Sequence, residues 1–187
     1  MAPPQGQKKE ADNRPFVPSI RSILYAITFF LIFCLTCAEL GLVSQQIHKY
    51  GRYAENYASL QYKNVLGLLL CAVIISLLLC LTHFFIPIGF LVFIALILAI
   101  FFGVGGGVIR TATPYRGTSC NRPVGDYPIA WQPYAHECSR VVTIQALSWT
   151  LFALYFFILF GSLGYLFRLC LRPTPGGLYG SPTRAVV

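Results

Sequence analysis

The stretch "IGFLVFIALILAIFFGVGGGVI", residues 88 to 109, contains no charged side chain and decides the fold of this chain. A run of about 18 or more apolar residues can cross a hydrocarbon core of roughly 30 Å as a helix that rises about 1.5 Å per residue. Lipid offers no partner to open backbone groups, so such a segment is expected to be helical. A membrane-spanning barrel would need repeated short strands of alternating polarity, and the sequence lacks them.

Three further apolar blocks of this kind accompany the first, at residues 23–43, 65–85 and 141–167. The whole chain is 56% hydrophobic and 11% charged, whereas a soluble domain carries roughly 25% charged residues. We therefore predict an all-α fold, an integral-membrane four-helix bundle over residues 20–170. The polar, proline-containing tails at residues 1–19 and 171–187 are expected to be disordered and to lie in the cytosol.

Two of the connections between blocks are short. The residues "THFFIPI" (82–88) predict a tight hairpin around Pro87, with a re-entrant pair of half-spans as the alternative. The connection at residues 44–64 is expected to extend the flanking helices in part. Its tyrosines form either an interfacial belt or, alternatively, a ligand site. They are Tyr50, Tyr53, Tyr57 and Tyr62.

The cysteines, rather than the basic residues, predict the orientation. Four spans place both termini on one side, and the 14 Lys and Arg residues divide seven against seven between the two sides. Of the seven cysteines, only Cys120 and Cys138 lie in a polar loop. Disulfides persist in extracellular and lumenal compartments, so we predict a bridge between them that closes an extracellular loop between the third and fourth helices. Two free thiols are the alternative.

Glu39 is the only acidic residue inside an apolar block. A charge in lipid is costly, so this side chain is expected to face the bundle and to find a partner there. Arg110 and Gln145 fall near the same end of their spans, and a contact of Glu39 with either one is predicted. The contact would act as an interhelical clasp, and the alternative is a proton or ion relay that also involves His83.

Two glycines, Gly103 and Gly107, form a GxxxG pair in the third block. Small residues at this spacing allow helix backbones in a membrane to approach closely. We predict that the pair packs helices within the bundle, with self-association between copies as the alternative. Cys170, directly after the fourth block, lies at a position suited to palmitoylation, although a plain juxtamembrane cysteine fits equally well.

The loop "TSCNRPVGDYPIAWQPYAHECSR" (118–140) is rich in aromatic residues that recognise surfaces. Tyr127, Trp131 and Tyr134 are predicted to form an exposed contact surface, stiffened by proline, and the alternative for Trp131 is a place in the lipid headgroup layer. A metal site at His136 and its neighbours would need more ligands than the sequence supplies. The motifs of soluble enzymes are absent, and no cofactor is expected. The net charge of +8 is split between two faces, which disfavours nucleic acid as a partner.

This layout resembles the MARVEL-domain family over about residues 20 to 170. The resemblance rests on a basic residue opening "RSILYAITFFLIFCLTCAELGLV", a modest first loop, a tight internal turn and a cysteine-bearing loop before "VVTIQALSWTLFALYFFILFGSLGYLF". The short tails and the acidic residue late in the first span are similar to those of fungal members of this family. The tryptophan and cysteine pattern of claudins and the Cys-Cys-Gly motif of tetraspanins are missing.

The resemblance implies a non-enzymatic role in vesicle trafficking, membrane apposition and sterol- or sphingolipid-rich domains of the plasma membrane, and it carries over no catalytic residue. We therefore expect a membrane organiser at the plasma membrane or in the secretory pathway. Its expected partners are lipids, other integral membrane proteins and, in a homo-oligomer, further copies of itself. The alternatives are an auxiliary subunit of a larger membrane complex and a small transporter or channel that uses Glu39.

Overall fold

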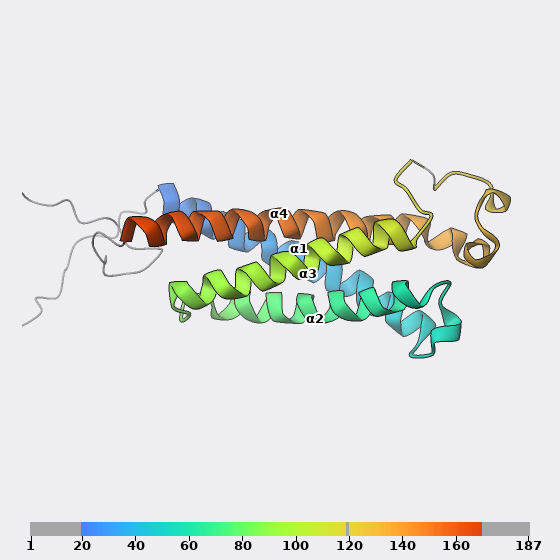
Figure 1. Cartoon of the computed structure of the whole chain (residues 1–187), viewed down its shortest axis with the longest axis horizontal. Helices are drawn as coiled ribbons and strands as arrows, with labels where there is room; N and C mark the ends of the chain where they lie inside the picture. The colour runs from blue at the N-terminus through green and yellow to red at the C-terminus, as the bar shows by residue number, and fades with distance from the viewer. Residues whose placement is uncertain (1–19, 119, 170–187) are drawn as a thin grey trace, which may run out of the picture.

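The computed structural model describes residues 20–118 and 120–169, and the part of the chain it describes is helical with no strand. Four long helices, α1 (Ile20–Tyr50), α2 (Leu60–Thr82), α3 (Ile88–Ala112) and α4 (Cys138–Leu169), run alternately up and down (Figure 1). Each packs against the helices before and after it, and α4 closes the ring against α1. The all-α four-helix prediction is confirmed.

Each of the four helices is long and apolar enough to cross a membrane. The candidate segments are Ile23–Tyr50, Leu60–Thr82, Ile88–Ala112 and Ile129–Gly164. The last segment begins with residues 129–140 of the loop, and its remainder, residues 141–164, lies within the predicted block at residues 141–167. The expected tails and the expected palmitoylation site at Cys170 lie outside the described residues.

The two ends of the bundle are built differently (Figure 1). At one end α2 stops at Thr82 and α3 starts after Pro87, which confirms the tight hairpin. The other end carries residues 51–59 and residues 113–137, two connections that we call the head. The head contains three short 3-10 helices, η1 (Ala54–Asn56), η2 (Val124–Asp126) and η3 (Ile129–Glu137).

The first connection of the head is shorter than the predicted 44–64, because both flanking helices extend into it. Gly51 ends α1 in the left-handed conformation, with φ of 72°, and its amide donates to the carbonyl of Ile47 over 2.8 Å. Glycine adopts this conformation without steric penalty. The hydroxyl of Ser59 accepts a hydrogen bond from the amide of Tyr62 over 3.2 Å and so caps the start of α2.

The interior of the bundle is apolar, with a few polar side chains. On α1 the buried face recurs at steps of three and four residues, the spacing of a single helix face. Its members are Phe29, Ile32, Thr36, Glu39, Val43 and Gln46. The inward face of α4 repeats the pattern with Ile144, Ser148, Leu151, Tyr155, Ile158 and Ser162.

Candidate functional site

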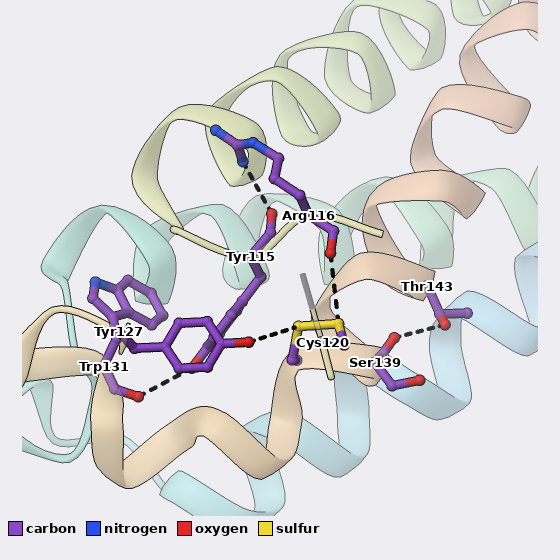
Figure 2. The surroundings of a disulfide bond; sticks show 8 residues. Tyr115, Arg116, Cys120, Tyr127, Trp131, Ser139 and Thr143 are labelled. Atoms are coloured by element: carbon purple, nitrogen blue, oxygen red, sulfur yellow. Dashed lines mark hydrogen bonds between the residues drawn. A yellow bond between two sulfur atoms is a disulfide. The ribbon is translucent and has the colours of Figure 1, made fainter. Parts of the chain in front are cut away.

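The head is the part of the molecule where polar, aromatic and cysteine chemistry gathers. A disulfide joins Cys120 to Cys138, with their Cα atoms 5.5 Å apart, and confirms the predicted pairing (Figure 2). Cys138 is the first residue of α4 and is buried. The bridge therefore fixes the first third of the long connection to the start of α4.

An aromatic cluster fills the space beneath the disulfide. Tyr115 is fully buried, and its ring lies 5.4 Å from the rings of both Tyr127 and Trp131. Its hydroxyl donates to the carbonyl of Trp131 over 3.2 Å, and the Tyr127 hydroxyl points toward the disulfide (Figure 2). Burial raises the pKa of the Tyr115 hydroxyl, and the same cause raises the pKa of Tyr57. Both phenols are therefore neutral donors.

The prediction that Tyr127, Trp131 and Tyr134 form an exposed contact surface is wrong. Tyr127 and Trp131 are buried, and Tyr134 is half-buried. Aromatic rings are the largest apolar groups available to this polar loop, so the loop folds around them. The large apolar side chains that are exposed in this loop are instead Val124 and Ile129, which are 54% and 86% accessible.

The two connections of the head are joined to each other. The Tyr134 hydroxyl donates to the carbonyl of Asn56 over 2.8 Å, and the Tyr134 ring packs edge-on against Tyr50 at 5.3 Å. The ring of Trp131 meets that of Tyr62, at the start of α2, at 5.9 Å. The long connection therefore rests on the short one and does not stand free.

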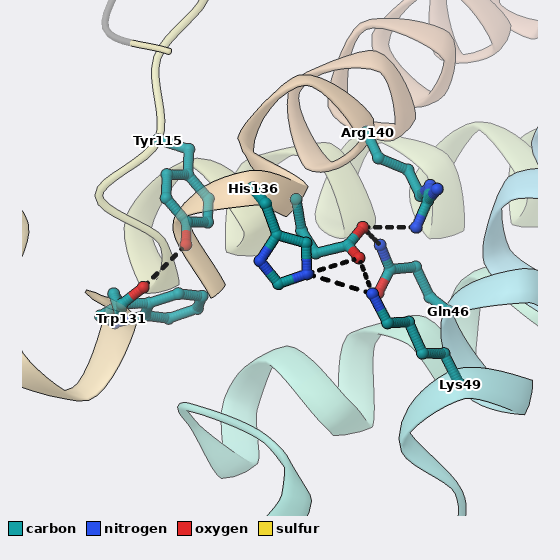
Figure 3. A network of polar contacts seen from close by, with 7 residues as sticks. Gln46, Lys49, Tyr115, Trp131, His136 and Arg140 are labelled. Atoms are coloured by element: carbon teal, nitrogen blue, oxygen red, sulfur yellow. Dashed lines mark hydrogen bonds and ion pairs between the residues drawn. The ribbon is translucent and has the colours of Figure 1, made fainter. Parts of the chain in front are cut away.

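Glu137 is the centre of an ionic network between α1 and the start of α4, and Figure 3 labels its partners Lys49 and Arg140. Its carboxylate is buried and pairs with Lys49 through one oxygen and with Arg140 through the other. The Gln46 amide donates to the second oxygen over 3.0 Å. His136 Nε2 lies 3.2 Å from the first oxygen and 3.1 Å from the Lys49 ammonium.

The electrostatic balance of this network keeps Glu137 ionised. Burial alone would raise the pKa of the Glu137 carboxyl, which lies in the head before the apolar part of α4 begins. The hydrogen bond from Lys49 and the charge of Arg140 outweigh burial, and the pKa falls below its usual 4.5. The carboxylate with its two cations therefore works as a clamp between two helices that are far apart in sequence.

Glu39 lies inside the bundle, as predicted, but with a different partner. It is fully buried, and its Oε1 accepts a hydrogen bond from the Ser148 hydroxyl of α4 over 2.6 Å. The predicted partners are wrong: Arg110 is exposed and Gln145 is half-buried. Arg110 directly follows the buried Ile109, and successive helical residues are rotated by about 100°, which turns Arg110 out of the bundle.

A second polar contact crosses the interior beside this pair. The hydroxyls of Thr36 and Ser76 lie 3.0 Å apart, and those of Ser76 and Tyr155 lie 2.5 Å apart. Three different helices, α1, α2 and α4, are joined in this way. His83, the other member of the alternative relay, lies in the hairpin at the far end of the bundle, where its ring stacks on Phe29 at 4.2 Å.

The glycine prediction is correct for one residue of the pair. A Cβ on Gly103 would lie 3.0 Å from a ring carbon of Phe152 on α4, so this glycine is in close contact, whereas Gly107 has nothing within 4 Å. The closest contacts are at Gly105, where a Cβ would lie 2.4 Å from a Leu69 methyl, and at Gly161, where it would lie 2.7 Å from the Tyr25 hydroxyl oxygen. The spacing rule finds glycines of one face, but it does not say which face is inward.

Sequence reasoning missed the Glu137 clamp. The sequence pairs Cys138 with Cys120, as the disulfide confirms, and it offers His136 and Glu137 only as too few ligands for a metal site, whereas Glu137 holds two cations. Within residues 20–118 and 120–169, no three His, Cys, Asp or Glu side chains group as metal ligands. Gln46, one heptad after Glu39 on the same face of α1, was the available signal.

No protein-family model, curated protein or solved structure matches this chain significantly.

Proposed function

We propose that this chain is a multi-pass membrane protein with four transmembrane helices, both termini in the cytosol and the head on the extracellular or lumenal side. The length and composition of the four helices support insertion. The disulfide supports the orientation, because such bonds persist outside the reducing cytosol. The plasma membrane or a membrane of the secretory pathway is the location that fits both features.

Its proposed function is to organise lipid and protein neighbours in the membrane, without catalysis. The observation that carries this proposal is the tip of the head, where Val124 and Ile129 are exposed on either side of the buried anchor Tyr127. The disulfide, the aromatic cluster and the Glu137 clamp hold this tip in place. A rigid support lowers the entropy lost when a surface binds a partner.

The similarity in layout to the MARVEL-domain family supports the same proposal and adds vesicle trafficking as the process served. Integral membrane proteins, a second copy of this chain and membrane lipids such as sterol or sphingolipid are the proposed partners. The exposed tip also favours a second candidate, an auxiliary subunit that docks on a larger membrane complex through Val124 and Ile129.

The test is extraction of the full-length chain together with its native lipids, followed by mass spectrometry of all the protein and lipid recovered. Wild type is compared with a Val124→Ser/Ile129→Ser variant. The matched control is Tyr53→Ser, which changes an exposed side chain of the other connection. Thermal unfolding of each variant confirms that the head is intact.

Each outcome separates the two candidates. Enrichment of sterol or sphingolipid over the source membrane, without a stoichiometric protein, supports the organiser. A stoichiometric protein that is lost only in the Val124→Ser/Ile129→Ser variant identifies an auxiliary subunit. Recovery of neither lipid enrichment nor a partner removes the organiser proposal.

A further inference from the structure

A small cavity lies inside the head, between the end of α1, the start of α2 and η3. Its volume is about 10 Å³, measured as space for the centre of a water-sized sphere. Gln46, Tyr50, Tyr62, Trp131 and Glu137 are among the residues that line it. A space of this size holds about one water molecule and is too small for an organic ligand.

Three buried polar atoms on the wall of this cavity have no hydrogen-bond partner. They are Gln46 Oε1, the Tyr50 hydroxyl and the Tyr62 hydroxyl. Gln46 is 1% exposed and Tyr62 is 4% exposed, so bulk water does not reach these groups. Buried polar atoms are almost always paired with protein or with ordered water, and three orphans around one cavity therefore point to a ligand.

The chemistry of the three atoms is fixed by their neighbours. The Gln46 amide nitrogen donates to the Glu137 carboxylate over 3.0 Å, so the amide cannot be reversed and Oε1 remains an acceptor. The hydroxyl of Tyr62 carries one hydrogen and remains a donor. The Lys49 ammonium, 5.5 Å from the centre of the Tyr50 ring, has no acceptor, so the hydroxyl hydrogen of Tyr50 remains available.

One acceptor and two donors select the ligand. A metal cation would lie beside the Glu137 cluster, whose carboxylate is already paired with Lys49 and Arg140. An anion would accept from the two hydroxyls but could not donate to Gln46 Oε1. A water molecule can do both, since it carries two donors and two acceptor sites.

We propose that the head binds one ordered water molecule, which donates to Gln46 Oε1 and accepts from the hydroxyls of Tyr50 and Tyr62. This water joins the end of α1 to the start of α2, directly behind the Glu137 clamp. The loop that connects the two helices contributes to the cavity through Tyr57. The site is a structural part of the head and is independent of the proposed function.

The test combines a high-resolution experimental structure of the full-length chain with thermal unfolding of Tyr62→Phe. We expect a solvent peak within hydrogen-bond distance of all three atoms. Because the variant deletes a donor to that water, the unfolding midpoint should fall by about 2–4 °C. Tyr50→Phe should lower the midpoint in the same direction, and Tyr53→Phe, which removes an exposed hydroxyl, should leave it unchanged.

The sign of the thermal shift makes the test decisive. If the Tyr62 hydroxyl had no partner at all, its deletion would relieve an unpaired buried group and raise the midpoint. A raised midpoint therefore overturns the proposal. So does a structure in which the hydroxyls of Tyr50 and Tyr62 bond directly to each other with no solvent peak between them, whatever the midpoint does.

Discussion

Replacing Glu137 with glutamine should loosen the head from the end of α1. The Glu137 side chain is 5% exposed, and its two oxygens pair with Lys49 and Arg140 and accept from Gln46. Glutamine keeps the shape and one acceptor oxygen, but it loses the charge and places an NH₂ group against a cation. The variant therefore removes the charge-assisted part of the network and little of the packing.

The size of the effect follows from how well the cations are buried. Breaking a fully buried ion pair costs about 3–5 kcal/mol, but the side chains of Lys49 and Arg140 remain 45% and 28% exposed and regain water when released. Hydrogen bonds to charged groups contribute about 1.5–3 kcal/mol. Glu137→Gln is therefore expected to lower the free energy of unfolding by about 2 kcal/mol.

Reversible unfolding of the full-length chain in detergent micelles, followed by tryptophan fluorescence, measures this change. Trp131 lies in the head and reports on it directly, and a Trp149→Phe background removes the second tryptophan. Glu55→Gln is the matched control, because Glu55 is an exposed acid of the same head. Equal stabilities of Glu137→Gln and Glu55→Gln would refute the clamp.

The same carboxylate gives the head a predictable acid sensitivity. The pKa of Glu137 is lowered on folding, so its contribution to stability is complete above the unfolded value of about 4.5 and is lost as pH falls through the lower folded pKa. The free energy of unfolding should therefore decrease as the pH is lowered from about 4.5. Glu137→Gln should remove this component of the pH profile and leave the rest, as a titration of unfolding against pH would measure.

The remaining predictions concern other parts of the chain. Cys120→Ser/Cys138→Ser opens a loop with a sequence separation of 18, and in the chain-entropy account the free energy of unfolding should fall by about 3 kcal/mol. Limited proteolysis of this variant should then cut residues 121–137 first. Gly105→Ala places a methyl 2.4 Å from a buried leucine and should destabilise by about 1–3 kcal/mol. Gly107→Ala meets open space and should be neutral or gain up to about 1 kcal/mol of helix propensity, so equal unfolding midpoints for the two would contradict the packing. In liposomes, Glu39→Gln should leave ion flux unchanged. If the wild-type chain conducts ions and this variant abolishes the flux, the proton or ion relay becomes the supported interpretation of Glu39.

The helices could be predicted from the sequence because lipid-length apolar blocks leave the backbone little choice. The hairpin around Pro87 and the pairing of Cys120 with Cys138 could also be predicted, since each rests on local spacing or on an even count of cysteines in one loop. These features depend on one segment at a time. They did not require knowledge of how any two helices are rotated against each other.

The contacts between segments could not be predicted, and the errors share this cause. The depth of Glu39 in the bundle was correct, but the partner depends on rotation about the helix axis, which brings Ser148 inward and turns Arg110 out. Because the rotation of the third helix was unknown, the predicted packing glycines included Gly107 and not Gly105. In the head, aromatic composition alone cannot distinguish a contact surface from a small core, and Trp131 belongs to the core.

The interior polar contacts favour a bundle that fixes its own register over one that conducts. Fully buried apolar residues, Val43 on α1 and Ile144 on α4, lie along the helices between the level of Gln46 and that of Glu39. A proton path would need continuous polar groups or water at these positions. Hydrogen bonds between helices in an apolar medium instead select one rotation and one axial position for each pair. The polar residues on one face of α1 therefore hold the helices in the register that places Gln46 beside Glu137. The Glu137 clamp of the head can form only in this register.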